Sequence, residues 1–183
     1  MTNPLLPMLA IPAVPFEGED YLFEVKWDGI RALAASEGGG RWRLWGRAGA
    51  DYTQRYPELA VLSRLPPGAV VDGELVVLRD GRADFPALLR RHQRHGPASL
   101  GLAACAARPA ISYVLFDLLF VQGRSLLQER LLQRRESLQQ LLARVNEPLL
   151  IYSDGVVGSG RAFFARVVAQ GHEGVMAKHL ASC

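Results

Sequence analysis

The chain has 183 residues, of which 49% are hydrophobic and 21% charged, and its formal net charge is +3. These values suit one globular domain with a proper core, and they permit contact with phosphate groups without requiring it. Two cysteines, Cys105 and Cys183, are too few for a disulfide framework or a zinc site. We therefore expect a reduced, cytoplasmic setting, with no membrane partner and no signal peptide.

Turn signals divide the first third of the chain into short elements. Residues 1–20 carry four spaced prolines and are predicted to be an irregular segment that wraps an edge of the domain. Alternating side chains predict strands over 21–27, 30–36 and 41–46, the last two separated by a triple-glycine turn. A short helix, introduced by a proline, is predicted over 55–64.

The middle of the chain is richer in apolar residues. A strand is predicted over 70–78, and the Asp80-Gly81 pair that follows it is typical of a hairpin turn. A helix is predicted over 85–94, and the Ala- and Gly-rich residues 97–109 are predicted to form a loop. The run 111–120 is predicted to be a further strand, interrupted by one charged residue.

The last third holds the clearest helix, predicted over 125–145 from leucines at helical spacing. A second helix is predicted over 161–170, ending at Gly171, and a final strand over 173–179. Strands outnumber helices and the hairpin signals favour antiparallel pairing, so the predicted fold class is α+β.

Lysine usage is the most informative feature of the composition. The chain has two lysines, Lys26 and Lys178, against 19 arginines. A guanidinium stays protonated and is a poor nucleophile, whereas a lysine amine can lose its proton and attack an electrophile. Each lysine is therefore a candidate for chemistry that arginine cannot perform.

Polar residues interrupt the predicted strands in five places. These are Glu24 to Arg31 (Glu-Val-Lys-Trp-Asp-Gly-Ile-Arg), Arg47, Asp72-Gly73-Glu74, Phe116-Asp117, and Glu173-Gly174 with Lys178. Residues two apart on a strand share a face, so Glu24 is expected to project beside Lys26, and Asp72 beside Glu74. Paired carboxylates suit ribose hydroxyls and a hard cation such as Mg²⁺. Asp117 is expected to have a partner, because an unpaired buried carboxylate is costly.

The order and spacing of these segments resemble the adenylation domain of ATP-dependent DNA ligases, within the covalent nucleotidyltransferase superfamily. The sequence is most similar to the ligase domain of bacterial end-joining ligases, through Pro7 to Ala10, Phe23 to Gly29 and Tyr56 to Leu59. The resemblance covers most of the chain. It implies a nucleotidyltransferase (ATP-grasp-like) fold, with antiparallel sheets flanked by helices around a nucleotide pocket.

The resemblance also implies an activity. Lys26 would attack the α-phosphate of ATP with Mg²⁺ or Mn²⁺ and carry AMP, which then passes to a 5′-phosphate at a nick or strand break in DNA during repair. Glu24 would meet the adenine amino group and Phe116 would stack on the adenine ring. The implied nucleotide-binding residues are Glu24, Val25, Arg31, Arg47, Glu74, Phe116 and Lys178. The implied metal ligands are Asp72, Glu74 and Glu173.

Strict alternation would place Glu173 and Lys178 on opposite faces of the last strand, because they are five residues apart. If both face the nucleotide, the chain has to bulge, and Gly174 is the expected place.

The family has a further lysine motif and an OB-fold domain beyond the segment that Glu173 begins. We expect neither within residues 1–183, and we expect slow adenylation and poor nick sealing unless a partner protein or domain supplies the OB-fold function. A chain cut short, a minimal protein completed by a partner and a degenerate binding module all fit this pattern. Two alternative functions stay open: an RNA ligase or capping-type nucleotidyltransferase, and a non-catalytic accessory protein that binds DNA ends or nucleotides.

Overall fold

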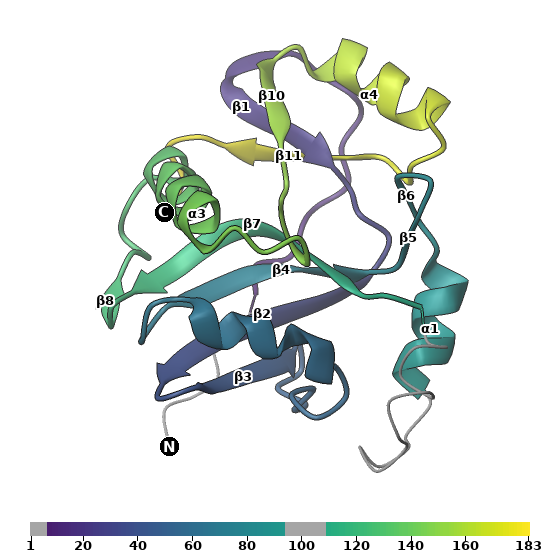
Figure 1. Cartoon of the computed structure of the whole chain (residues 1–183). Helices are drawn as coiled ribbons and strands as arrows, with labels where there is room; N and C mark the ends of the chain where they lie inside the picture. The colour runs from purple at the N-terminus through teal and green to yellow at the C-terminus, as the bar shows by residue number, and fades with distance from the viewer. Residues whose placement is uncertain (1–6, 94–108) are drawn as a thin grey trace.

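The computed structural model describes residues 7–93 and 109–183, which form two sheets with helices packed on them (Figure 1). The small sheet has the strand order β10-β1-β11, and the large one has the order β3-β2-β4-β7-β8. A further strand, β9, runs parallel to β7, whereas the strand pairs of the order just given are antiparallel. The α+β fold class predicted from the sequence is therefore confirmed.

The strands have the following bounds. The small sheet consists of β1 (Gly18–Val25), β10 (Gly155–Gly158) and β11 (Val175–His179). The large sheet consists of β2 (Ile30–Gly38), β3 (Arg41–Gly46), β4 (Val70–Val76), β7 (Ser112–Val121), β8 (Arg124–Ser125) and β9 (Leu150–Tyr152). A separate hairpin pairs β5 (Leu78–Arg79) with β6 (Arg82–Ala83).

Helices cover both sheets. The 3₁₀ helix η1 (Pro57–Arg64) packs on β2 and β3, and α3 (Leu131–Val145) packs on β7 and β9. Helix α4 (Gly160–Ala169) packs on the small sheet, and α1 (Phe85–Gln93) contributes buried residues to the core of the large sheet. Within the described residues, no helix is both long and apolar enough to cross a lipid bilayer.

The two sheets have separate hydrophobic cores. The larger core includes Leu44, Leu59, Leu115 and Leu138, each 0% exposed. The smaller core lies between β1 and α4 and is built on a cluster that contains Phe23. Because each sheet is stabilised by its own apolar cluster, the space between the sheets is left to polar side chains.

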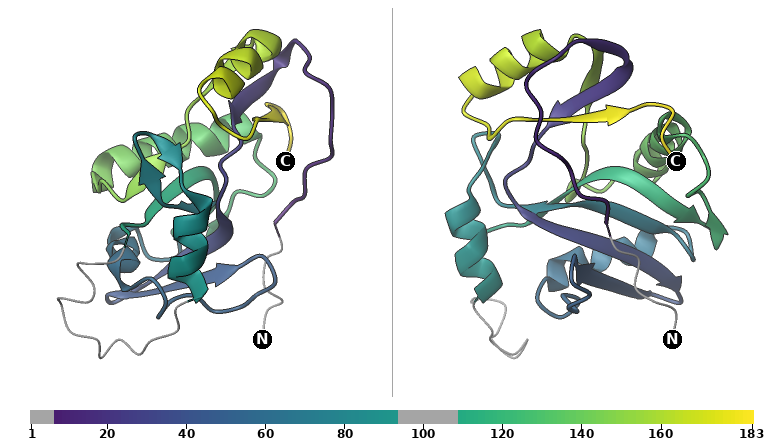
Figure 2. Two further views of the ribbon diagram at one scale, coloured as in Figure 1. Left: turned by 90° about the vertical axis from the view of Figure 1, so that its right-hand side faces the viewer. Right: turned by 180° about the vertical axis from the view of Figure 1, so that it is seen from behind.

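The structure changes the bounds of several predicted elements. The strand predicted over 21–27 ends at Val25, and the N-terminal segment predicted to be irregular to residue 20 already forms β1 from Gly18. Residues 7–17 are irregular as predicted and run along one side of the molecule from the large sheet to the small one (Figure 2). The loop predicted over 97–109 lies almost wholly outside the described residues.

Helix α3 begins six residues later than the sequence predicts, because two sets of hydrogen bonds place its first turn. The Gln133 side chain accepts a hydrogen bond from the backbone N–H of Arg130 at 3.2 Å. The backbone N–H of Leu131 donates to the carbonyl of Ser182 at 2.8 Å, so the end of the chain satisfies a donor that a helix start leaves unpaired. Upstream, Arg124–Ser125 pairs with β7 instead of joining the helix.

Two glycines are placed where a side chain would not fit or would be strained. A Cβ at Gly29 would lie 2.3 Å from the carbonyl oxygen of Leu75, so glycine lets the turn after β1 approach β4 closely. Gly171 has a φ of 82° and ends α4, as the sequence predicts. The Asp80-Gly81 hairpin is also confirmed, since it joins β5 to β6.

Two leucines on α3 provide a matched test of this packing. Leu138 is 0% exposed, whereas Leu132 on the same helix is 46% exposed. We expect Leu138→Ala to lower the free energy of unfolding by about 2–5 kcal/mol, because it leaves a cavity in the larger core. Leu132→Ala should change it by less than about 1 kcal/mol. Urea unfolding followed by circular dichroism measures both, and equal losses would show that α3 does not pack as described.

Candidate active site

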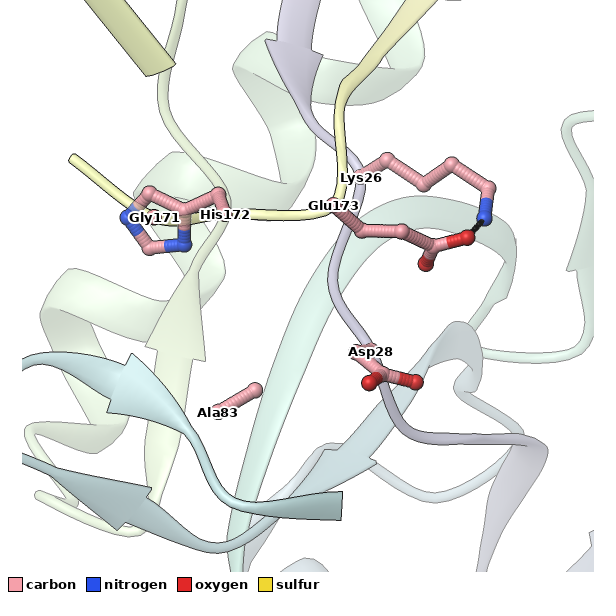
Figure 3. Close-up of a pocket in the computed structure, with 6 residues that line it drawn as sticks. All are labelled: Lys26, Asp28, Ala83, Gly171, His172 and Glu173. Atoms are coloured by element: carbon pink, nitrogen blue, oxygen red, sulfur yellow. Dashed lines mark hydrogen bonds and ion pairs between the residues drawn. The ribbon is translucent and has the colours of Figure 1, made fainter. Parts of the chain in front are cut away.

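A cavity of about 210 Å³ lies where the segment after β1 and the segment before β11 meet the β5–β6 hairpin. It is lined by Lys26, Asp28, Ala83, Gly171, His172 and Glu173. Figure 3 shows the Lys26 and Glu173 side chains meeting on one wall, with Ala83 of the β5–β6 hairpin across the opening. The lysine singled out by the sequence therefore lies at the mouth of a polar cavity.

Lys26 follows directly after β1 and is held there by its backbone. Its N–H donates to the carbonyl of Gly174 at 2.8 Å, which joins the end of β1 to the segment before β11. Its amine forms an ion pair with Glu173, and the two side chains are 43% and 44% exposed. The amine is therefore accessible from solvent and has a carboxylate as its ion-pair partner.

Glu173 lies before β11, so alternation along the strand does not govern its position. The pairing of β11 with β1 is regular from Val175, opposite Val25, to His179, opposite Tyr21. The expected bulge at Gly174 is therefore wrong: residue 174 precedes the strand. Glu173 reaches the cavity from this preceding segment, whereas Lys178 projects from the strand itself.

Three carboxylates surround Lys26 and influence one another. Burial raises the pKa of Glu74 to about 7, and the nearby charge of Asp28 adds to the rise while Lys26 opposes it. Desolvation raises the pKa of Asp28, Glu173 raises it further and Lys26 lowers it. Two of these carboxylates, Asp28 and Glu173, line the cavity together with Lys26, so negative charge is concentrated around one amine.

Asp72 has a different role from the metal ligand that the sequence predicts. Arg31 donates two hydrogen bonds to its carboxylate, at 2.6 Å and 2.7 Å, and the Asp72 side chain is 6% exposed. Burial raises the pKa of Asp72, and the hydrogen bonds from Arg31 oppose the rise. Among the described residues, no three acidic, histidine or cysteine side chains converge on a common metal position. The expected set of Asp72, Glu74 and Glu173 is therefore not assembled.

Asp117 has the partner that its burial requires. It lies opposite Asp72 in the β4–β7 pair, so two carboxylates face each other across adjacent strands. Arg134 donates to the two oxygens of Asp117 at 2.8 Å and 2.9 Å, while Arg31 holds Asp72. Each carboxylate is matched by its own guanidinium, which offsets the cost of taking the charges out of water.

Glu24, Lys178 and Phe116 form the inner wall between the sheets. Glu24 is 1% exposed, and its carboxylate accepts from Arg135 and, at 2.5 Å, from Lys178. The Lys178 amine lies 4.0 Å from the centre of the Phe116 ring, and the Arg31 guanidinium lies 4.4 Å from it. Burial lowers the pKa of Lys178, and Glu24 opposes that change.

The other predicted site residues do not contact the side chains of Glu24, Lys178 and Phe116 in the way the sequence predicts. Lys26 turns to Glu173 and Glu24 to Arg135 and Lys178, so the two neighbours do not share one set of contacts as their spacing predicts. Val25 packs against the smaller core, which leaves its backbone for any contact with a ligand. Arg47 is exposed in the turn after β3, at the edge of the large sheet.

Arg135 is the main site residue that the sequence analysis missed. It reaches between the sheets from α3, where it lies between the buried Leu131 and Leu138 on the helix face that packs on β7. A signal was present: Arg134 and Arg135 occupy core-facing positions of an amphipathic helix, where charged residues are rare unless paired.

Comparison with known proteins agrees with this geometry. Residues 7–183 match the family model of the ATP dependent DNA ligase domain. The chain is 32% identical over 165 residues to the SPbeta prophage-derived DNA ligase-like protein LigB of Bacillus subtilis, covering 90% of this chain and 56% of that protein. It is 33% identical over 179 residues to the multifunctional non-homologous end joining DNA repair protein LigD of Mycobacterium tuberculosis, covering 95% of this chain and 21% of that protein.

Solved structures are similar as well. The mycobacterial DNA ligase D complexed with ATP and MES superposes with a TM-score of 0.78 at 32% identity, covering 97% of this chain and 55% of that one. The Chlorella virus DNA ligase-adenylate, with a TM-score of 0.63 at 19% identity, shares the fold, covering 99% of this chain and 62% of that one. The chain spans about a fifth to a little over half of the length of the curated relatives described above. It belongs to the family of ATP-dependent DNA ligase domains.

Proposed function

We propose that this chain adenylates itself on Lys26, as the nucleotidyltransferase part of an ATP-dependent DNA ligase. The proposal rests mainly on the position of the Lys26 amine, which lies at a cavity in an ion pair with Glu173 and interacts electrostatically with Glu74. Two further cations, Arg31 and Lys178, contact the Phe116 ring. This arrangement offers a nucleophile, countercharge for phosphates and a surface for a base.

In the proposed reaction the Lys26 nitrogen bonds to the α-phosphorus of ATP, and the bond from that phosphorus to the pyrophosphate oxygen breaks. Pyrophosphate leaves, and the lysine ammonium group loses two of its three protons to solvent, so the phosphoramidate nitrogen keeps one hydrogen. Lys178 and Arg31 supply positive charge where negative charge builds up on the phosphate oxygens. Phe116 offers its ring to the adenine, in place of one of the two cations that now contact it.

The proposed binding of adenine by Glu24 involves a competition. Both carboxylate oxygens are engaged, one by Arg135 and the other by Lys178. An adenine amino group can donate to Glu24 only where it shares or replaces the contact with Lys178. Release of Lys178 from Glu24 would leave its amine free to meet the α-phosphate, so base recognition and phosphate binding would be linked through one carboxylate.

A divalent cation near Lys26 would be held by Glu173, at the cavity, and by Glu74, together with phosphate oxygens of the substrate. Mg²⁺ prefers oxygen ligands and commonly uses one or two carboxylates plus the phosphates of its substrate. Asp28 raises the pKa of Glu74, and Glu173 raises the pKa of Asp28, a repulsion that a cation would relieve. When bound, the cation would offset phosphate charge, and a Glu173 that holds it would release the Lys26 amine from its ion pair.

The later steps involve DNA. AMP would pass from Lys26 to a 5′-phosphate at a nick or strand break, and a 3′-hydroxyl would then displace AMP to seal the strand. The names of the relatives, which include DNA ligases and end-joining repair proteins, support this substrate class. Because those relatives are longer, we propose that a further domain or partner protein contributes to the sealing step.

Adenylation has a direct test. Incubation with ATP and Mg²⁺ should increase the mass of the intact protein by one AMP residue, and pyrophosphate should reverse the gain. Lys26→Arg should lower the initial rate of adduct formation at least about a thousandfold, because arginine keeps the charge but is a poor nucleophile. Intact-protein mass spectrometry measures both, and peptide mapping distinguishes Lys26 from the only other lysine, Lys178.

The controls separate the alternatives. Incubation with GTP in place of ATP should give no adduct, whereas a GTP adduct would favour a capping-type enzyme. A folded wild-type protein that never gains AMP would instead support a non-catalytic role in binding nucleotides or DNA ends.

Glu74 gives a prediction about pH. Its pKa of about 7 in the folded protein lies above the ordinary value of 4.5, so the folded state holds the proton more tightly than the unfolded state does. This contribution to stability is present below about pH 4.5 and is lost as the pH rises through about 7. The metal-free wild type should therefore lose on the order of 3 kcal/mol over this range relative to Glu74→Gln.

Urea unfolding at a series of pH values, compared between the wild type and Glu74→Gln, measures this difference. Glu136→Gln on the exposed side of α3 is the matched control and should follow the wild type. Parallel curves for the wild type and Glu74→Gln would contradict the raised pKa.

A further inference from the structure

We propose that Arg135 is a positioning residue of the nucleotide pocket: it fixes the Glu24 carboxylate and, through Glu24, sets where the Lys178 amine lies. The inference rests on the proposed function for its consequence in catalysis, but its structural part can be tested without activity. The motifs on which the sequence analysis based the family resemblance do not include Arg135, and the residue enters the site from a helix rather than from a strand.

The contacts of Arg135 join four parts of the chain. Its Nη1 donates to a Glu24 oxygen on β1 and to the Phe116 carbonyl on β7 at 3.0 Å. Its Nη2 donates to the carbonyl of Ser153, after β9, at 2.5 Å, and its guanidinium lies 4.7 Å from the centre of the Tyr152 ring. The side chain is 5% exposed. A planar, buried fork with this many partners has a single orientation.

Glu24 passes this orientation on to Lys178. One oxygen of the buried carboxylate accepts a hydrogen bond from Arg135, and the other pairs with the Lys178 amine at 2.5 Å. With both cations present, Glu24 neutralises only part of the charge of Lys178, so the amine keeps attraction for a phosphate. Without Arg135, Glu24 and Lys178 would neutralise each other in a buried ion pair. Separating such a pair is costly, because it leaves two unpaired charges out of water.

The groups around Lys178 determine the direction of the effect. Burial lowers the pKa of Lys178, Glu24 raises it, Arg135 lowers it and Asp117 raises it. Asp72 on β4 also interacts electrostatically with the amine. Removal of Arg135 takes away a cation that repels Lys178, and Glu24 then pairs with Lys178 only. The pKa of Lys178 should therefore rise.

Arg134 provides the matched control. It is the neighbouring residue of α3, its side chain is 7% exposed, and it also holds a carboxylate, that of Asp117, with two hydrogen bonds. Its other hydrogen bonds go to the carbonyls of Glu129 and Ser182, on the side of α3 that faces the end of the chain. A substitution here removes a buried, paired guanidinium without removing a partner of Glu24.

The first experiment uses the two lysines of the chain. Protein labelled with [¹³C]lysine should give one Cε signal for Lys26 and one for Lys178. In Arg135→Met the Lys178 signal should titrate at a pH at least about half a unit higher than in the wild type, and in Arg134→Met it should move less. The signal that disappears in Lys26→Arg belongs to Lys26, so the other belongs to Lys178. In the Arg135 and Arg134 variants the Lys26 signal serves as the internal reference.

The second experiment measures adenylation kinetics. Arg135→Met should raise the KM for ATP about tenfold, the scale expected when a residue that orients a ligand group is lost. Arg134→Met should raise it by less than about threefold at comparable loss of stability, so the comparison separates positioning from folding. The KM of Arg135→Lys for ATP should lie between those of the wild type and Arg135→Met. An ammonium group restores a cation but cannot hold Glu24 and two carbonyls together.

The outcomes are distinct. If Arg135→Met and Arg134→Met give the same Lys178 titration, the inference is wrong. If Arg135→Met does not fold, Arg135→Lys decides, and a Lys178 titration unchanged from the wild type would overturn the inference. If the wild type forms no lysyl-AMP, the proposed function fails, while the titration still shows whether Arg135 positions Glu24 and Lys178.

Discussion

The need to pair buried charges organises the space between the two sheets. Glu24, Asp72 and Asp117 are each taken out of water, and each is held by a guanidinium, that of Arg135, Arg31 or Arg134 respectively. An ion buried without such a partner costs several kcal/mol, so the folded state requires these ion pairs. The positions of the arginines therefore set the positions of the carboxylates and of whatever those carboxylates hold.

The consequence for function is a division of the site into two zones. The inner zone, with Glu24, Lys178 and Phe116, is tightly paired and shielded from solvent. The rim, with Lys26, Asp28 and Glu173, is more open to water, and its negative groups outnumber its amine. A paired interior keeps the geometry constant, whereas an accessible rim lets a lysine exchange protons and meet a substrate.

Both sheets contribute to this division because neither could build it alone. The small sheet brings Glu24 and Lys178 on neighbouring strands, and the large sheet brings Arg31, Asp72 and Phe116. Each sheet has a separate hydrophobic core that stabilises it without using these residues. Polar side chains at the junction are thus free to serve binding, which is a common location for ligand sites in proteins.

Elements with a strong local signal were predictable from the sequence, including the end of α4 at Gly171, the Asp80-Gly81 hairpin and the need of Asp117 for a partner. Lys26 and Lys178 also stood out, because their amines contrast with the arginines used elsewhere. The late start of α3 was not predictable, since the carbonyl of Ser182 satisfies its first donor from the far end of the chain.

Residue type and local periodicity are read along the chain, so the amino-acid sequence identifies residues with unusual chemistry. Which of these residues meet depends on long-range packing, as with Arg135 and Glu24, which are 111 positions apart. Periodicity reports which face of an element is buried, but it does not report which other element covers that face. The pairing of charges between α3 and the two sheets depends on that packing, and so it appears only in the folded chain.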